Sequence, residues 1–199
     1  MPRAGLSPET VVLAAAEIAD AEGLEAVTPS AVAHRLGVRP PSIYAHVDGA
    51  GDLRRRLLAR ALDESADRVA EAVAGRAGDE AVRALAEAHR QWAHQHPGRY
   101  AATRIVTSGA EDDEASLLAL AAGRRHADLL RAALRAYGLD DAAEVHAVRS
   151  VGAFVHGFIA LELAGSFEHS RPAAASSWCV GLRIILAGIA DLARDSAGP

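Results

Sequence analysis

A short run of polar side chains after Gly37 has the residue types that contact nucleic acid. Arginine can read the edge of guanine, and proline rings or alanine can touch the methyl group of thymine. Serine, tyrosine and histidine side chains can hold phosphate oxygens. The positions that would face outward from a helix in this run are Arg39, Pro40, Pro41, Ser42, Tyr44, Ala45 and His46. They predict a helix that enters the major groove of double-stranded DNA.

A second set of aromatic and basic side chains lies in the later part of the chain. Such side chains can line a cavity between helices, where small-molecule sites commonly form. A helical core also needs large residues for packing, and this is the alternative explanation. The set comprises His89, Trp92, Tyr100, Arg104, His126, Phe154, His156 and Phe158. We predict that it binds a small-molecule effector.

The sequence gives no sign of a catalytic or metal site. Its nine histidines form neither a His-Glu-x-x-His nor a Glu-x-x-His pattern, the helical motifs of zinc peptidases and di-iron bundles. It also lacks the Gly-x-Ser-x-Gly motif of hydrolases and a glycine loop that would cradle phosphate. We therefore expect no catalytic residue, no metal and no cofactor, and leave a helical enzyme or metal-binding bundle as an alternative.

Charge and composition limit the possible partners. The formal net charge of -5 argues against a chain that coats nucleic acid indiscriminately. Between His34 and Arg60, however, six arginines face two aspartates, which predicts phosphate contacts in this region. The single cysteine, Cys179, favours a reducing compartment. No apolar run reaches the roughly 20 residues that span a bilayer, so we expect a cytoplasmic protein without membrane contact.

Helix signals frame the polar run after Gly37. Serine or threonine followed by proline starts a helix, and glycine ends one. These signals predict three short helices within residues 7–47, the third with Ile43 and Val47 as its buried side. The start signals are Ser7-Pro8 and Thr28-Pro29, and the stop signals are Gly23 and Gly37. A helix, a tight glycine turn and a second short helix form the helix-turn-helix arrangement.

The rest of the chain reads as six further helices, which makes the fold all-α with about nine helices. We predict a DNA-binding domain over residues 1–50 and a helical ligand-sensing and dimerisation domain over residues 51–199. One of the six is a short segment that is expected to end near Ser108-Gly109. The acidic residues 111–114 suit the start of the helix that follows it. The remaining predicted helices cover residues 53–73, 79–96, 111–137, 141–167 and 171–194.

The DNA-contact region resembles the signature of the tetracycline-repressor (TetR) family. The similarity lies in TPSAVAHRLGVRPPSIYAHV, with its Leu-Gly-Val turn and its Ile-Tyr-x-His-Val ending. By this resemblance, the residues near bases or the adjacent backbone are Thr28, Ser30, Arg39, Pro40, Pro41, Ser42 and Tyr44, and His46 is near phosphate. The family usually has a phosphate-binding lysine where this chain has Ala50. Arg54 could replace it, while Arg55 and Arg56 are expected on a solvated face.

A second resemblance concerns the residues around His156-Gly157, which are similar to the His-Gly element in one branch of TetR-family sensor domains. The family implies a homodimer built from the last two helices, a palindromic operator and repression relieved by ligand. The apolar circumference of residues 145–163 suits such a dimer, as does a stripe of Leu182, Ile185, Leu186, Ile189 and Leu192. Ala50 leaves open a sensor-only protein with a degenerate DNA-binding domain.

Overall fold

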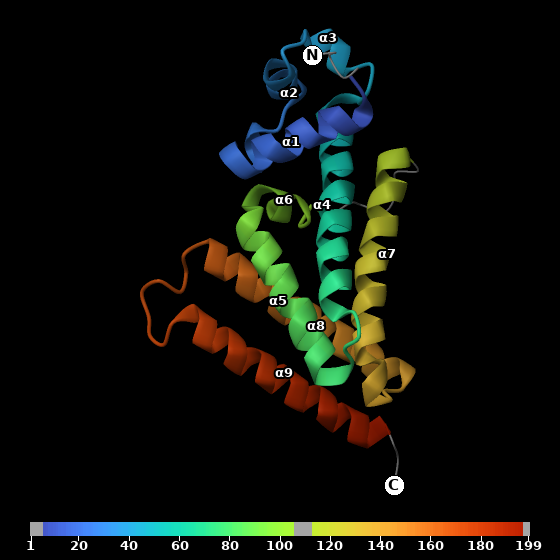
Figure 1. The fold of residues 1–199 in the computed structure, drawn as a ribbon, viewed down its shortest axis with the longest axis vertical. Coiled ribbons are helices and arrows are strands. Elements are labelled where there is room, and N and C mark those ends of the chain that lie inside the picture. The colour runs from blue at the N-terminus through green and yellow to red at the C-terminus, as the bar shows by residue number, and fades with distance from the viewer. Residues whose placement is uncertain (1–5, 106–112, 197–199) are drawn as a thin grey trace. The chain divides into compact units, whose positions relative to one another are not determined.

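The computed structural model describes residues 6–105 and 113–196 (Figure 1). Over these residues the secondary structure is entirely helical, which confirms the all-α prediction. It comprises nine α-helices and two single-turn 3₁₀ helices, Leu24–Ala26 and Arg135–Tyr137. The α-helices are α1 (Pro8–Glu22), α2 (Pro29–Leu36), α3 (Pro40–Ile43), α4 (Gly49–Val73), α5 (Gly78–Gln95), α6 (Pro97–Ala102), α7 (Glu114–Leu134), α8 (Asp141–Leu163) and α9 (Ala174–Ser196).

The start and stop signals of the first two helices act as predicted. The Ser7 hydroxyl accepts the Thr10 amide at 3.2 Å, and the Thr10 hydroxyl accepts the Ser7 amide at 2.8 Å, which completes a capping box. Thr28 caps α2 through the Ala31 amide at 3.1 Å. Gly37 ends α2 in the left-handed conformation, with φ of 66°.

Three predicted helix ends were wrong. The helix α3 ends at Ile43, and a turn follows in which the His46 amide donates to the Ile43 carbonyl at 2.9 Å. The helix α8 ends at Leu163 because Gly165, with φ of 71°, closes it. The helix α9 begins at Ala174, after the proline that was expected to open it. The predicted boundaries at Ser108-Gly109 and Glu111 lie outside the described residues.

By packing, the chain divides into two compact units, each described here by itself. Unit 1 comprises the described parts of Met1–Ser65 and Gln95–Arg125, and unit 2 comprises those of Ala66–His94 and His126–Pro199. Both α4 and α7 contribute residues to each unit, and about two thirds of α4 belongs to unit 1. The functional division into residues 1–50 and 51–199 stays a prediction.

The core of unit 1 holds the first three helices together. Val11 and Ile18 of α1, Val32 of α2 and Leu53 of α4 are fully or almost fully buried in one cluster. Ile43 of α3 lies in the same cluster and is also fully buried. The apolar side of each short helix is therefore buried in the core, and its polar side faces outward.

The helix α6 is seated directly on the backbone of α1. A Cβ atom at Gly98 would lie 1.9 Å from the carbonyl oxygen of Ala19, so only glycine fits. Asp20 accepts the Arg99 amide at 2.9 Å and pairs with the Arg99 guanidinium at 3.1 Å. His96 Nδ1 lies 3.2 Å from the same carboxylate. Close packing and an ion-pair network thus fix α6 to α1.

In unit 2, α8 and α9 pack against each other. A Cβ atom at Gly181 would lie 2.3 Å from the Phe154 ring, so the helices approach closely at this glycine. Leu182, Leu186 and Ile189 are buried within the unit. The stripe that the sequence assigned to a dimer is therefore spent largely on packing inside one chain. Ile185 and Leu192 of the same stripe are only partly buried, so the homodimer stays a prediction. Periodicity identifies an apolar face without saying what covers it.

Candidate functional site: a DNA-contact edge and a histidine cluster

The polar run after Gly37 points away from the core of unit 1. Arg39 stands at the N-terminal cap of α3, where its side chain makes no capping hydrogen bond. Ile43 and Val47 are buried and anchor the segment, while Tyr44 is 58% exposed. The predicted contact residues are all exposed except His46, which is partly buried: Thr28, Ser30, Arg39, Pro40, Pro41, Ser42 and Tyr44. Among the described residues the arrangement leaves these side chains exposed as a polar edge, which we call the contact edge.

Most arginines in this region are neutralised within unit 1. Among the six arginines of residues 34–60, Arg39 alone takes part in no ion pair between described residues. The other pairs are Arg35 with Glu17 and Glu22, Arg54 with Glu25, Arg55 with Asp113, Arg56 with Asp52 and Glu114, and Arg60 with Glu64. The excess positive charge counted from the sequence therefore overstates the charge available to phosphates.

The arginine triplet at the start of α4 does not form a solvated face. Arg55 and Arg56 are only partly exposed, and they reach Asp113 and Glu114 at 3.0 and 2.9 Å. These contacts join α4 to the start of α7 inside unit 1. The expectation of a solvated face was wrong because both acidic partners are distant in sequence. Arg54, the expected substitute for a phosphate-binding lysine, lies 3.1 Å from Glu25.

Four of the predicted ligand residues come together in unit 2. The His89 ring of α5 lies 5.1 Å from the ring of His126 on α7 and 5.0 Å from that of His156 on α8, both edge to face. Trp92 stacks on His89 at 6.1 Å. We call His89, His126 and His156 the histidine triad. Burial lowers the pKa of His89 well below its usual range, and the His156 and His126 imidazoles lower it further.

The other four predicted ligand residues lie elsewhere. Phe154 and Phe158 pack on Trp178 at ring distances of 5.3 and 5.2 Å, in an aromatic cluster of α8 and α9. Tyr100 and Arg104 belong to unit 1, where Tyr100 is buried and Arg104 is exposed. The packing alternative therefore accounts for the two phenylalanines, whereas the triad gathers polar groups.

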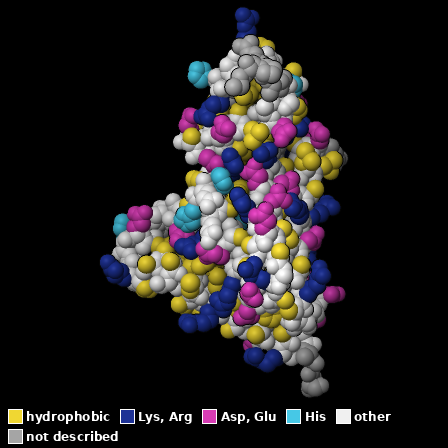
Figure 2. Space-filling model, in the orientation of Figure 1, with side chains coloured by type: hydrophobic (Ala, Val, Ile, Leu, Met, Phe, Trp, Pro, Cys, Tyr) yellow, Lys and Arg dark blue, Asp and Glu magenta, His cyan; other side chains and the backbone are white. Residues whose placement is uncertain are grey.

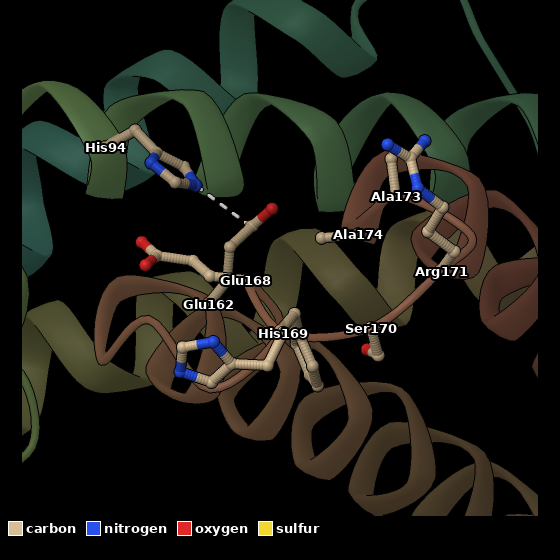
Figure 3. Close-up of a pocket in the computed structure, with 9 residues that line it drawn as sticks. His94, Glu162, Glu168, His169, Ser170, Arg171, Ala173 and Ala174 are labelled. Atoms are coloured by element: carbon tan, nitrogen blue, oxygen red, sulfur yellow. Dashed lines mark hydrogen bonds and ion pairs between the residues drawn. The ribbon is translucent and has the colours of Figure 1, made fainter.

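A cavity of about 620 Å³ opens beside the connection between α8 and α9 (Figure 3). None of the predicted ligand residues lines it, although Phe158 packs on its Phe167 at 4.8 Å. Figure 3 places His94, Glu162, Glu168 and His169 on one side and Arg171 on the other. The lining residues are His94, Glu162, Phe167, Glu168, His169, Ser170, Arg171, Ala173 and Ala174.

One wall of this cavity is an ion-pair network that the sequence analysis missed. Glu162 accepts hydrogen bonds from Arg90 at 2.8 and 2.6 Å and contacts His94 at 2.9 Å. The Arg90 hydrogen bonds hold the pKa of Glu162 below its usual range. Arg90 also lies over the Trp178 ring, 5.1 Å from its centroid. No local signal predicts this network, because Arg90 and Glu162 are 72 positions apart.

Over residues 6–105 and 113–196, no group of three His, Cys, Asp or Glu side chains is arranged to hold a metal ion.

Comparison with known proteins adds the family. Residues 82–185 match the family described as "Tetracyclin repressor-like, C-terminal domain". The chain is 40% identical over 165 residues to the HTH-type transcriptional regulator Rv0681 of Mycobacterium tuberculosis, covering 83% of this chain and 74% of the relative. It is 32% identical over 189 residues to the HTH-type transcriptional regulator YobS of Bacillus subtilis, covering 94% and 95%.

Solved structures share the fold. BioQ bound to its double-stranded DNA operator is 24% identical with a TM-score of 0.67, over 94% of this chain and 99% of BioQ. Streptomyces coelicolor ActR in complex with (S)-DNPA is 22% identical with a TM-score of 0.65, over 94% and 98%. The matched family is one of regulators and not of enzymes, as the sequence predicts. The chain belongs to the TetR family of helix-turn-helix transcriptional regulators.

Proposed function

We propose that this chain is a cytoplasmic repressor that binds a palindromic operator as a homodimer and leaves it when a small ligand binds. The contact edge is the observation that carries the proposal, because buried Ile43 and Val47 fix it in an outward position. The operator complex of BioQ and the ligand complex of ActR, which share this fold, support the two activities. A twofold dimer would place two contact edges on successive major grooves, about 34–36 Å apart.

Gel-shift titration with DNA from the gene's own neighbourhood, repeated across salt concentrations, tests this proposal. Arg39→Ala and Tyr44→Ala should each weaken operator binding about tenfold or more, since a good base contact contributes about 1–3 kcal/mol. Arg35→Ala is the matched control, because Arg35 is already paired with Glu17 and Glu22. All three variants should remain dimeric by size-exclusion chromatography.

Equal losses in the Arg39 and Arg35 variants would place the DNA contacts elsewhere. A wild-type protein that shifts no specific DNA while still binding ligand would favour the sensor-only alternative.

The N-terminus of α4 explains why phosphate binding should be weak and how it can be improved. Ala50 is exposed at the position where the family resemblance implies a lysine, and the Asp52 carboxylate already accepts the nearby Asp48 amide at 2.9 Å. Ala50→Lys should tighten operator binding several-fold and steepen the slope of log K against log salt by about 0.9, the value for one added phosphate contact. Ala50→Gln controls for side-chain length. An unchanged slope would mean that α4 does not approach the backbone.

Exposed apolar side chains on α8 and α9 support the homodimer. Ile184 is 65% exposed and Val180 43% exposed on α9, while Val145 and Leu161 are exposed on α8. Figure 2 shows hydrophobic side chains gathered along α9. By length and composition alone α9 could also cross a membrane, with only 22% of its most apolar window buried, but core helices of soluble proteins meet the same test. Scattered exposed apolar residues need no explanation, but a contiguous group of them marks an interaction surface. A second copy of the chain would cover this surface.

The histidine triad with Trp92 is the proposed ligand site. Ligand would bind better to a conformation whose contact edges no longer fit the operator, so that it shifts the population away from the DNA-bound form. The helix α4 continues from unit 1 into unit 2 and is the proposed connection. His156-Gly157 falls inside the matched region 82–185, and membership of the His-Gly branch is part of this proposal. The roles predicted for Tyr100 and Arg104 of unit 1, and for Phe154 and Phe158 beside Trp178, stay untested, and these residues are not assigned to this site.

A further inference from the structure

The histidine triad runs from the surface of unit 2 to its interior. His156 on α8 is exposed, His126 on α7 is partly exposed and His89 on α5 is 2% exposed. Three helices therefore bring three imidazoles together. The centroid of the His89 ring lies 5.1 Å from that of His126 and 5.0 Å from that of His156. A group entering at His156 would meet the three imidazoles in turn, each of which can donate a hydrogen bond or carry a proton, and Trp92 stacks beside His89.

The surroundings of His89 oppose a positive charge on the empty triad. Burial removes the imidazolium from water, and the neighbouring imidazoles of α7 and α8 add repulsion when they are charged. The charged residues of α5 closest to His89 in sequence are engaged elsewhere: Glu87 accepts the Trp178 indole at 3.0 Å, and Arg90 holds Glu162. An anion placed among the three rings would reverse this balance, because it attracts a proton on any of them.

We infer that the effector is an organic acid whose anionic oxygens are bound by the histidine triad and whose apolar body lies against Trp92. This inference rests on the proposed function, since it names the chemical class of the ligand at the proposed site. The triad takes up a proton as the acid anion binds, so that the anion is neutralised inside the protein.

The direction of the pH effect follows from the depressed pKa of His89. Near pH 8 the empty site holds a neutral His89, and binding the anion raises the pKa of that imidazole. Affinity for the anion should therefore rise as the pH falls from about 8 towards about 6, by up to about tenfold per pH unit where one full proton is taken up. A neutral ligand of the same shape should show no such dependence.

Isothermal titration of the full-length dimer with matched acids and amides tests the inference. The pairs are benzoate and benzamide, phenylacetate and phenylacetamide, and indole-3-acetate and indole-3-acetamide. At least one acid should bind more tightly than its amide, more so at the lower pH, and its heat should change with the buffer in the sense of proton uptake. His156→Gln and His89→Gln should remove the preference, and His156 is exposed enough for its variant to fold. His146→Gln, an exposed histidine on the same helix, is the matched control.

The outcomes separate this inference from the proposed function. Acids and amides of equal affinity, or an acid preference that survives His156→Gln, would overturn the organic-acid assignment. A stabilising shift by Zn²⁺ alone that His156→Gln removes would assign the triad to a metal and also overturn it. If a neutral compound releases the operator, the ligand-responsive repressor stands and the anion inference fails.

Discussion

Replacing Ile184 with aspartate is expected to separate the dimer and to lower operator affinity by about a hundredfold or more. Ile184 is the most exposed large apolar side chain on α9, so the substitution costs little in the isolated chain. In the dimer it would bury a carboxylate without a partner, a change that costs several kcal/mol. Two linked half-site contacts also bind about 10²–10⁴ times better than one, and a monomer forfeits this gain.

Analytical ultracentrifugation over a range of protein concentrations measures the dimer, and gel shift measures the operator affinity. Leu117→Asp is the matched control, because Leu117 is 58% exposed on α7 and receives the same charge. It should remain dimeric and bind DNA normally. A dimeric Ile184→Asp protein, or an equal loss in both variants, would move the interface away from the exposed row of α9.

Local signals predict the helices well because they act through the nearest residues. Ser7 and Thr28 reach amides only three positions away, and Gly37 ends α2 by its own backbone conformation. The contact edge was predictable for the same reason, since one turn of chain decides which side chains face outward. The early end of α8 was missed because Gly165 was not taken as a stop signal.

Pairings between distant residues could not be predicted in this way. Arg55 meets Asp113 and Arg90 meets Glu162 because tertiary packing brings their helices together. The charge count of residues 34–60 therefore suggested a phosphate-binding surface, whereas most of those arginines bind carboxylates of their own unit. The same limit applies to α9, whose regular stripe of leucine and isoleucine packs inside the chain and leaves a different row exposed.

Some of the predicted ligand residues could be expected to lie together from the sequence, and others could not. His89 and Trp92, three positions apart on one helix, were predictable neighbours. His126 and His156 join them from other helices, and residue type alone suggested them. Tyr100 and Arg104 have the same residue types but belong to the other packing unit. Residue chemistry therefore selects candidates, and only the packing of α5, α7 and α8 decides which of them form a cluster.

Replacing Gly98 with alanine is expected to destabilise the protein by about 2 kcal/mol or more, because overpacking commonly costs about 1–3 kcal/mol and here the obstacle is backbone. The added Cβ atom would lie 1.9 Å from the Ala19 carbonyl oxygen and 2.5 Å from the Asp20 amide nitrogen. The two helices would have to separate, and this would also stretch the contacts of Asp20 with Arg99 and His96.

The opposite sign is expected at Gly123, which lies within α7 and has no atom within 4 Å of its Cβ position. Alanine there should stabilise the helix by about 0.5–1 kcal/mol, since glycine is entropically unfavourable in helices. Thermal unfolding at one fixed protein concentration compares the variants, and Gly98→Ala should lower the midpoint by roughly 5–10 °C. Similar midpoints for the two variants would mean that α6 can leave its seat on α1 at little cost. In that case α6 would not fix α1, and with it the contact edge, within unit 1.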